Sequence, residues 1–136
     1  MTALIDIRYE DTVEYVLNIT EAKVIKVYDG DTITIGFFKE GSTSPYRTSV
    51  RLLGIDTPEM RGKTIEEKTS AKLAQQFLSS QILGKIVTLT NVSKEKYGRL
   101  LADVYCNEIH INQLMIDNNY ATAYFGGTKQ EFKEAK

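Results

Sequence analysis

The stretch that decides the fold is residues 22–35, AKVIKVYDGDTITI, in which two β-branched runs flank Asp29-Gly30-Asp31. β-branched residues favour strands, and Asp and Gly favour tight turns, so the stretch predicts a strand, a turn and a second strand. Residues 39–45, KEGSTSP, have the composition of a loop. A third strand is expected from Arg47 to Ile55, which makes the first half of the chain a β-meander.

The pattern changes after Thr64, because apolar residues then recur at the spacing of one helical face until Gly84 ends the run. The residues expected to face inward on this helix are Ile65, Ala71, Leu73, Ala74, Phe77, Leu78 and Leu83. The remaining elements are expected as strands at 85–91 and 99–105, a helix at 111–118 with Ile111, Leu114 and Met115 inward, and an extended piece at 120–125. Five short strands with a helix between the third and fourth predict an α+β, mainly β fold: a five-stranded OB-fold barrel with two to three helices.

Size and composition indicate one globular domain. The chain has 136 residues, of which 42% are hydrophobic and 26% are charged, which excludes disorder and low complexity. No stretch approaches the roughly 18 apolar residues of a membrane span. The single cysteine, Cys106, excludes an intrachain disulfide and a cysteine-based zinc site.

The charge of the chain is unevenly distributed. Residues 1–22 carry five acidic side chains and one basic one, a net −4, and the other 114 residues carry a net +3, which permits phosphate binding. Residues 1–21 are interpreted as an acidic extension with an extra edge strand from Val13 to Ile19, residues 22–127 as the domain, and 128–136 as a short tail. The N-terminus as given has no export signal, so a cytoplasmic protein and a processed secreted form are both consistent with it.

Two acidic clusters fall at strand ends, Asp29-Gly30-Asp31-Thr32 and Asp56-Thr57-Pro58-Glu59. Taken alone, the first is typical of a β-turn and the second of a helix start. If the meander brings them together, carboxylates without nearby Cys or His would suit Ca²⁺ or Mg²⁺ rather than zinc.

Basic residues accompany these clusters. Arg51 lies within an apolar strand and needs a fixed partner, either a phosphate or a structural carboxylate. Lys96-Tyr97-Gly98-Arg99 is equally consistent with a hairpin tip. Carboxylates that hold a metal, arginines for the developing charge and a further carboxylate for water are together what phosphodiester hydrolysis requires.

In order and approximate spacing, Asp29-Gly30-Asp31-Thr32, the run RLLGIDTPE from Arg51 to Glu59, and Lys96-Tyr97-Gly98-Arg99 resemble the signature blocks of the staphylococcal nuclease (thermonuclease) family. The resemblance covers about residues 22–125 and implies an OB-type barrel. It implies the following roles: Asp31, Asp56 and Thr57 as Ca²⁺ ligands, Asp29 as support for the turn, Arg51 and Arg99 on the scissile phosphate, Glu59 on the attacking water, Lys96 and Tyr97 on the substrate's terminal phosphate or sugar, and Tyr124 or Phe125 as a stacking wall.

The resemblance implies a monomeric Ca²⁺-dependent nuclease that cleaves DNA and RNA, with single strands preferred, at the P–O5′ bond and leaves 3′-phosphates. The alternative is a catalytically silent OB-fold module that binds nucleic acid or protein. The segment after Glu59 departs from the family pattern because it is shorter than in the best-known member, which puts in question how Glu59 is held. His110 and Cys106 lie outside the three blocks and are interpreted as a strand-to-helix boundary residue and a buried small side chain.

Overall fold

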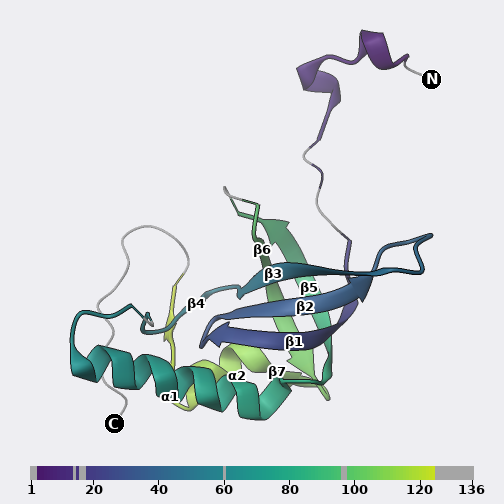
Figure 1. Cartoon of the computed structure of the whole chain (residues 1–136). Helices are drawn as coiled ribbons and strands as arrows, with labels where there is room; N and C mark the ends of the chain where they lie inside the picture. The colour runs from purple at the N-terminus through teal and green to yellow at the C-terminus, as the bar shows by residue number, and fades with distance from the viewer. Residues whose placement is uncertain (1–2, 14, 16–17, 60, 96–97, 125–136) are drawn as a thin grey trace.

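The computed structural model describes residues 3–13, 15, 18–59, 61–95 and 98–124. Its main body is a small β-barrel with two helices on one side, and the N-terminal residues run away from this body as an arm (Figure 1). The arm contains two 3-10 turns, Leu4–Asp6 and Tyr9–Asp11, and has no buried residue in either.

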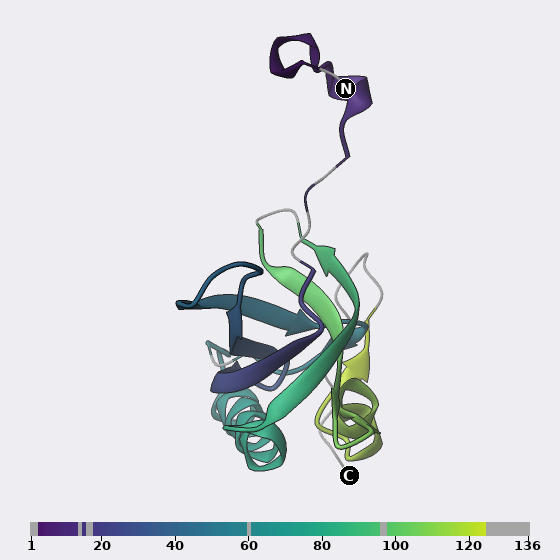
Figure 2. The ribbon, with the colours of Figure 1, turned by 90° about the vertical axis from the view of Figure 1, so that its right-hand side faces the viewer.

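Five strands close the barrel: β1 (Glu21–Asp29), β2 (Thr32–Phe38), β3 (Pro45–Leu52), β5 (Ile86–Lys94) and β6 (Leu100–Cys106). They pair in the order β3-β2-β1-β5-β6, and parallel pairing of β3 with β6 joins the two edges (Figure 2). All other pairings between these strands are antiparallel. Alternate side chains point inward and form one core, in which Ile33, Ile35 and Val50 are fully buried. The predicted five-stranded OB-type barrel is confirmed.

β3 ends at Leu52, three residues before the predicted end of the third strand. The chain turns at Gly54, whose φ of +78° lies in the left-handed region that favours glycine. Ile55–Asp56 then form a separate short strand, β4, which pairs with β8 (Thr122–Ala123). The prediction of one continuous strand to Ile55 was wrong because a turn that depends on a single glycine interrupts the apolar run.

Helix α1 (Ile65–Ile82) crosses the lower side of the barrel next to β1 (Figure 1). Its N-cap is Thr64, whose side chain accepts a hydrogen bond from Glu67 N at 3.0 Å. The buried face consists of Ala71, Ala74, Leu78 and Ile82. Ile65, Leu73 and Leu83 are 81%, 51% and 49% exposed, so the predicted inward face was too wide. The contact with the barrel follows one narrow row of side chains spaced three and four residues apart.

Helix α2 (Ile111–Asp117) follows the two-residue strand β7 (Ile109–His110) and buries Ile111 and Met115 as predicted. Its Asn112 is a buried polar anchor. Asn112 Oδ1 accepts a hydrogen bond from Val104 N at 2.8 Å, and Asn112 Nδ2 donates to Leu53 O at 2.8 Å and Ala102 O at 3.2 Å. The side chain therefore fixes the turn that separates β3 from β4.

The expected edge strand from Val13 to Ile19 is not seen in the part of that stretch that the structure describes. Residues 13, 15, 18 and 19 lie outside any strand, and 14, 16 and 17 are outside the described residues. Val13 and Tyr15 are 92% and 72% exposed, so their apolar side chains gain no burial from an edge position. Ile19 is buried in the core, and Thr20 O accepts a hydrogen bond from Leu89 N at 2.8 Å where the chain enters the barrel.

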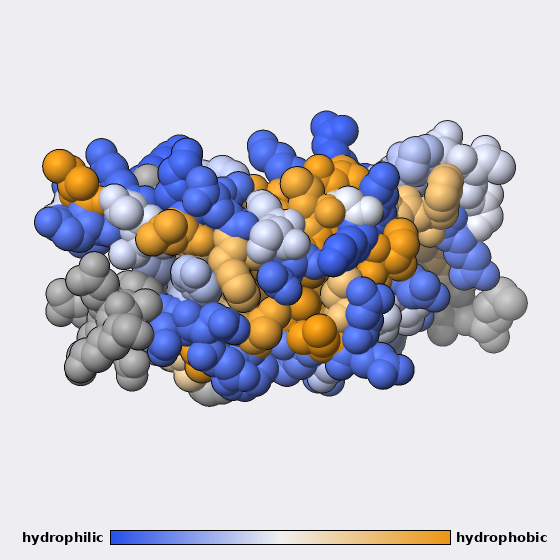
Figure 3. Space-filling view, turned by 90° about the horizontal axis from the view of Figure 1, so that it is seen from below, coloured by the Kyte–Doolittle hydropathy of each residue, from blue (hydrophilic) through white to orange (hydrophobic). Residues whose placement is uncertain are grey.

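Seen from below, the surface interleaves hydrophobic and hydrophilic side chains (Figure 3). The exposed hydrophobic residues of the structure include Leu73, Leu83 and Ile86. Among the described residues, no helix has both the length and the apolar character needed to cross a membrane.

Candidate active site

The first acidic cluster forms the turn between β1 and β2. Asp31 N donates to Asp29 Oδ1 at 3.1 Å, and Leu52 N donates to Asp31 O at 2.8 Å, which ties the turn to the end of β3. A Cβ on Gly30 would lie 2.8 Å from Ala74 Cβ and 2.9 Å from Thr57 Cγ2. The turn therefore packs directly against α1 and the second cluster, and only glycine fits at its centre.

The second acidic cluster lies at β4 and joins the first through Asp31. Thr57 N donates to Asp31 Oδ2 at 3.2 Å across 26 residues of sequence. Asp31, Asp56 and Thr57 are all buried, at 6%, 6% and 2% exposure. The two acidic clusters therefore meet in the structure, as expected if the first half of the chain folds as a β-meander.

Arg51 is held between the two buried carboxylates. Its Nη2 lies 3.4 Å from Asp31 Oδ2 and 3.2 Å from Asp56 Oδ1, and its guanidinium carbon lies 5.6 Å from the centre of the Tyr124 ring. The side chain keeps 14% of its surface exposed. Arg51 thus has structural partners and also faces the solvent-accessible side of the site.

Glu59 follows in a turn whose backbone is fixed by α1. Gly62 N donates to Glu59 O at 3.0 Å, and Lys63 N donates to Glu67 Oε2 at 2.8 Å. A Cβ on Gly62 would lie 2.6 Å from Glu67 Cβ, so this turn is packed closely against the first turn of the helix. Gly62 and Lys63 are therefore anchored at the helix N-terminus, and Glu59 itself is exposed.

Arg99 enters from the opposite side, just before β6, and is paired with Glu95. Arg99 Nη2 donates to Glu95 Oε2 at 3.3 Å, and Arg99 Nε donates to Glu95 Oε1. The hydrogen bond that Arg99 donates to Glu95 raises the pKa of Arg99, although partial burial opposes the shift, so the guanidinium stays charged. The side chain of Arg99 is 39% exposed and can reach a ligand.

These side chains line one cavity of about 590 Å³. Of the residues singled out in the sequence, the cavity collects Asp29, Asp31, Thr32, Arg51, Asp56, Thr57, Glu59, Arg99 and Tyr124. Lys96, Tyr97 and Phe125 lie outside the described residues. Three further lining residues, Tyr28, Arg61 and Glu95, were not predicted from the sequence. Each lies within two residues of a signature block, but its type is common on any surface, so no sequence signal distinguished it.

The electrostatics of the cavity are dominated by crowded carboxylates. Burial, followed by the hydrogen bond and the charge of Asp31, raises the pKa of Asp29 to about 7. Burial and the neighbouring Asp31 both oppose the ionisation of Asp29. A cationic side chain relieves the repulsion between crowded carboxylates, and Arg51 does so for Asp31 and Asp56 through its two ion pairs.

The donor set fits a hard divalent cation with open positions. The described residues contain no group of three or more His, Cys, Asp or Glu side chains that could hold a metal, so a fully protein-enclosed site is not present among them. Two buried carboxylates nevertheless meet at the cavity, and Thr57 Oγ1 is a buried oxygen with no hydrogen-bond partner in the described structure. Ca²⁺ and Mg²⁺ accept such oxygen ligands and complete their shells with water or a substrate phosphate.

His110 and Cys106 lie away from this cavity. His110 Nε2 lies 2.9 Å from Asp103 Oδ1, and its ring stacks on Tyr105 at 4.7 Å, directly before α2. Cys106 is buried at the end of β6. The structure agrees with their interpretation as a boundary residue and a buried small side chain.

The barrel and the carboxylate–arginine cavity define the class: an OB-type domain with a polar site at the mouth of the barrel. Residues 49–136 match the family model described as "Staphylococcal nuclease homologue". The chain therefore belongs to the staphylococcal nuclease family, as the sequence blocks had indicated.

Individual relatives agree with this assignment. The chain is 40% identical over 107 residues to an uncharacterized protein of Bacillus anthracis, which covers 76% of this chain and 47% of that protein. It is 30% identical over 114 residues to a thermonuclease of Staphylococcus hyicus, covering 82% of this chain and 64% of the relative. It is 30% identical over 103 residues to an uncharacterized endonuclease of Escherichia coli, covering 75% and 60%. The chain thus spans about half to two thirds of the length of these relatives.

Proposed function

We propose that the chain is a Ca²⁺-dependent nuclease that hydrolyses phosphodiester bonds of DNA and RNA. Water attacks phosphorus, the P–O5′ bond breaks, the 5′ oxygen leaves with a proton, and the other product carries a 3′-phosphate. The observation that carries the proposal is the meeting of Arg51, Arg99 and Glu59 with the Asp31–Asp56 pair in one open cavity.

Arg51 and Arg99 bind the phosphate in this proposal. A guanidinium offers a planar pair of donors that matches two phosphate oxygens, and it remains charged at every physiological pH. Arg51 lies in β3 and Arg99 lies just before β6, and both line the same cavity, so they can approach one phosphate from two sides. Their charge stabilises the additional negative charge that develops on the equatorial oxygens as water attacks.

Glu59 positions or deprotonates the attacking water. It is exposed at the cavity wall, and its backbone oxygen accepts a hydrogen bond from Gly62 N, so the chain next to the carboxylate is tied to the start of α1. A carboxylate within hydrogen-bond reach of the water can accept its proton. Tyr124 lines the cavity with its ring against Arg51 and supplies a surface for a base or sugar.

Asp31, Asp56 and Thr57 are the residues that would hold Ca²⁺. When bound, the ion would polarise the phosphate and offset the carboxylate charge. In the structure Arg51 neutralises the two carboxylates through its two ion pairs. If Ca²⁺ neutralised them instead, the guanidinium would be available to bind phosphate.

The test is cleavage of single-stranded DNA and RNA with Ca²⁺, with Mg²⁺ and with chelator, in which Glu59→Ala and Arg99→Ala are run beside the parent. We expect Ca²⁺-dependent cleavage with 3′-phosphate ends and losses of about 100-fold or more in both variants. Calorimetric titration of Ca²⁺ into the parent and Asp56→Asn gives a readout independent of turnover. Ca²⁺ binding without cleavage in any condition would contradict the nuclease proposal.

One observation favours a second function. Both arginines are engaged within the protein, Arg51 with two carboxylates and Arg99 with Glu95. A silent barrel that only binds nucleic acid would keep these pairs as structural supports. Tight oligonucleotide binding with no cleavage in the experiment above would identify this alternative.

A further inference from the structure

The outer face of the β1–β2–β3 sheet forms a continuous path that leads to the cavity. Pairing across the three strands arranges outward side chains in rows: Asp29–Thr32–Arg51 at the cavity, then Lys26–Thr34–Ser49, then Lys23–Gly36–Arg47. The inward residues between them are the core residues Ile33, Ile35 and Val50. Arg51 therefore belongs both to the cavity and to this face, and the face extends the site by about 20 Å along β2 to Phe38.

The middle of this face is positively charged. The three strands carry Lys23, Lys26, Arg47 and Arg51, and their acidic residues are Glu21 and Asp29, the two ends of β1. Lys23, Lys26 and Arg47 are exposed, and within the described part of the chain none of the three forms an ion pair. Arg51, by contrast, is paired with two carboxylates.

The centre of the face carries small side chains, and aromatic side chains lie at its two ends. The outward positions of β2 are Thr34 and Gly36, and a Cβ on Gly36 would lie 3.5 Å from Ile25 Cγ2, so Ile25 covers the glycine with an aliphatic surface. Lys23 and Arg47 flank Gly36 with Cα atoms about 10 Å apart. Tyr28, 49% exposed, stands at the cavity end, and Phe38, 67% exposed, stands at the hairpin end.

We propose that this basic strip, consisting of Lys23, Ile25, Lys26, Thr34, Gly36, Phe38, Arg47 and Ser49, binds the single-stranded nucleic acid that flanks the bond at the cavity. The inference rests on the proposed function, because the cavity defines where the scissile phosphate lies. Charge complementarity supplies the attraction to a polyanion, and the shared row at Thr32 and Arg51 makes the strip continuous with the cavity.

The aromatic ends favour a single strand over a duplex or an acidic peptide. Unpaired bases have open faces that stack on exposed rings, whereas the bases of a duplex are already stacked on each other. Cations on both sides of a centre with small and aliphatic side chains can bind the phosphates of one strand whose bases face the protein. OB-folds bind roughly 4–16 nucleotides, which is more than the cavity by itself accommodates.

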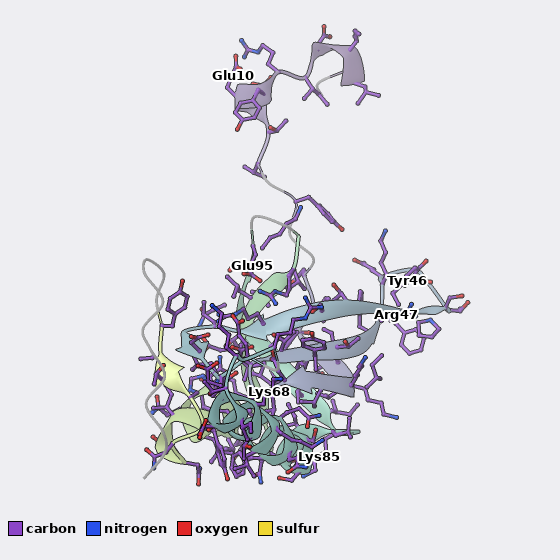
Figure 4. All side chains as sticks on the ribbon, turned by 60° about the vertical axis from the view of Figure 1, so that its left-hand side comes forward. Glu10, Tyr46, Arg47, Lys68, Lys85 and Glu95 are labelled. Atoms are coloured by element: carbon purple, nitrogen blue, oxygen red, sulfur yellow. The ribbon has the colours of Figure 1, made fainter. Side chains whose placement is uncertain are left out.

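The test compares two double variants that each remove two positive charges. Lys26→Gln/Arg47→Gln changes the basic strip, and Lys68→Gln/Lys85→Gln is the control. Figure 4 shows Arg47 beside the β2–β3 hairpin, whereas Lys68 and Lys85 lie lower, on and next to α1. Binding of fluorescent dT15 and dT3 is measured by anisotropy in chelator over a range of salt concentrations, so that cleavage does not interfere.

The strip variant is expected to bind dT15 about tenfold more weakly than the parent, with the salt slope reduced by about 1.4, since two phosphate contacts are lost. The control and dT3 binding are expected to change by less than twofold. The proposed role of the basic strip would be overturned if both double variants lost the same affinity for dT15 or if neither lost any. It would also be overturned if a 15-base-pair duplex showed the same dependence on the strip.

Phe38→Ala tests the stacking contribution separately, with Leu73→Ala as a control that removes an exposed apolar side chain from α1. We expect Phe38→Ala to weaken dT15 binding about tenfold at every salt concentration, because stacking is not a counterion effect. An unchanged affinity would overturn the stacking role of Phe38.

These outcomes separate the two proposals. If the parent cleaves and binds dT15 and the strip variant behaves like the control, only the proposed role of the basic strip is contradicted. A parent that neither cleaves nor binds oligonucleotides contradicts the proposed function and, with it, the inference.

Discussion

The two connections at the ends of β2 both contain residues that turns favour, but they are packed very differently. Residues 29–31 lead into the strand and consist of Asp and Gly, and residues 39–44 lead out of it and include Gly and Ser. The first is packed against α1 and Thr57 and is tied to β3 by a hydrogen bond to Asp31 O. The second has local bonds such as Ser42 N to Lys39 O, at 2.9 Å, and is largely exposed. Packing, rather than turn chemistry, makes one of them part of a site.

The largest effect is expected for Arg51, which links the first turn to Asp56. Arg51→Lys should lower kcat for oligonucleotide cleavage by about 100-fold or more, because an ammonium cannot replace the planar donor pair in the transition state. Arg8→Lys, in the exposed arm, is the control and should cleave like the parent. Steady-state kinetics with circular dichroism as the folding check provide the measurement, and turnover within threefold of the parent would remove Arg51 from the proposed role.

The second effect compares the glycines of the two connections. Gly30→Ala should lower the free energy of unfolding by about 2–3 kcal/mol, because its Cβ would overlap Ala74 and Thr57. Gly41→Ala has open space around it and only the strain of a φ of +79°, so a loss of about 1 kcal/mol is expected. Urea denaturation measures both. A larger loss at Gly41 would mean that backbone conformation, not packing, distinguishes the two turns.

The third effect is stabilisation by Ca²⁺. At ten times the dissociation constant, Ca²⁺ should stabilise the parent by about 1.4 kcal/mol and raise its Tm, because the proposed ligands come together only in the folded protein. Asp31→Asn should lose this shift, whereas Glu40→Gln, in the loop between β2 and β3, should retain it. Thermal denaturation with and without Ca²⁺ is sufficient, and a shift that survives in Asp31→Asn would place the ion elsewhere.

The smallest effect compares two hydroxyl groups. Thr57→Val should leave the free energy of unfolding unchanged or raise it by up to about 1 kcal/mol, because Thr57 Oγ1 is buried without a partner in the described structure. Ser42→Ala should lower it by less than about 0.5 kcal/mol, since Ser42 only bonds Ser44 in an exposed loop. If Thr57→Val is clearly destabilising, Thr57 Oγ1 has a structural role that the described contacts do not include.

The parts of the fold that were predicted correctly have strong local patterns. The strands on either side of Asp29-Gly30-Asp31 and the helix capped by Thr64 were placed correctly, although β2 continues three residues beyond the predicted run, to Phe38. The break at Gly54 was missed because the apolar run continues on both sides of it, and a single glycine does not indicate a turn by itself. Leu73 was wrongly placed on the inward face of α1, because helical periodicity does not distinguish the buried row of side chains from apolar residues directly beside it.

Sequence alone determined the element types, the barrel and the three blocks that indicated the family, because propensity, alternation and spacing are local properties of the chain. Tertiary structure decided that Asp31 and Asp56 share Arg51, that Tyr28, Arg61 and Glu95 join the cavity, and that Lys23 and Arg47 flank Gly36. These relations depend on strand register and on the closure of β3 against β6, which join residues far apart in the chain. Only the packed barrel sets that register, because burying one face of each strand fixes which side chains share the other.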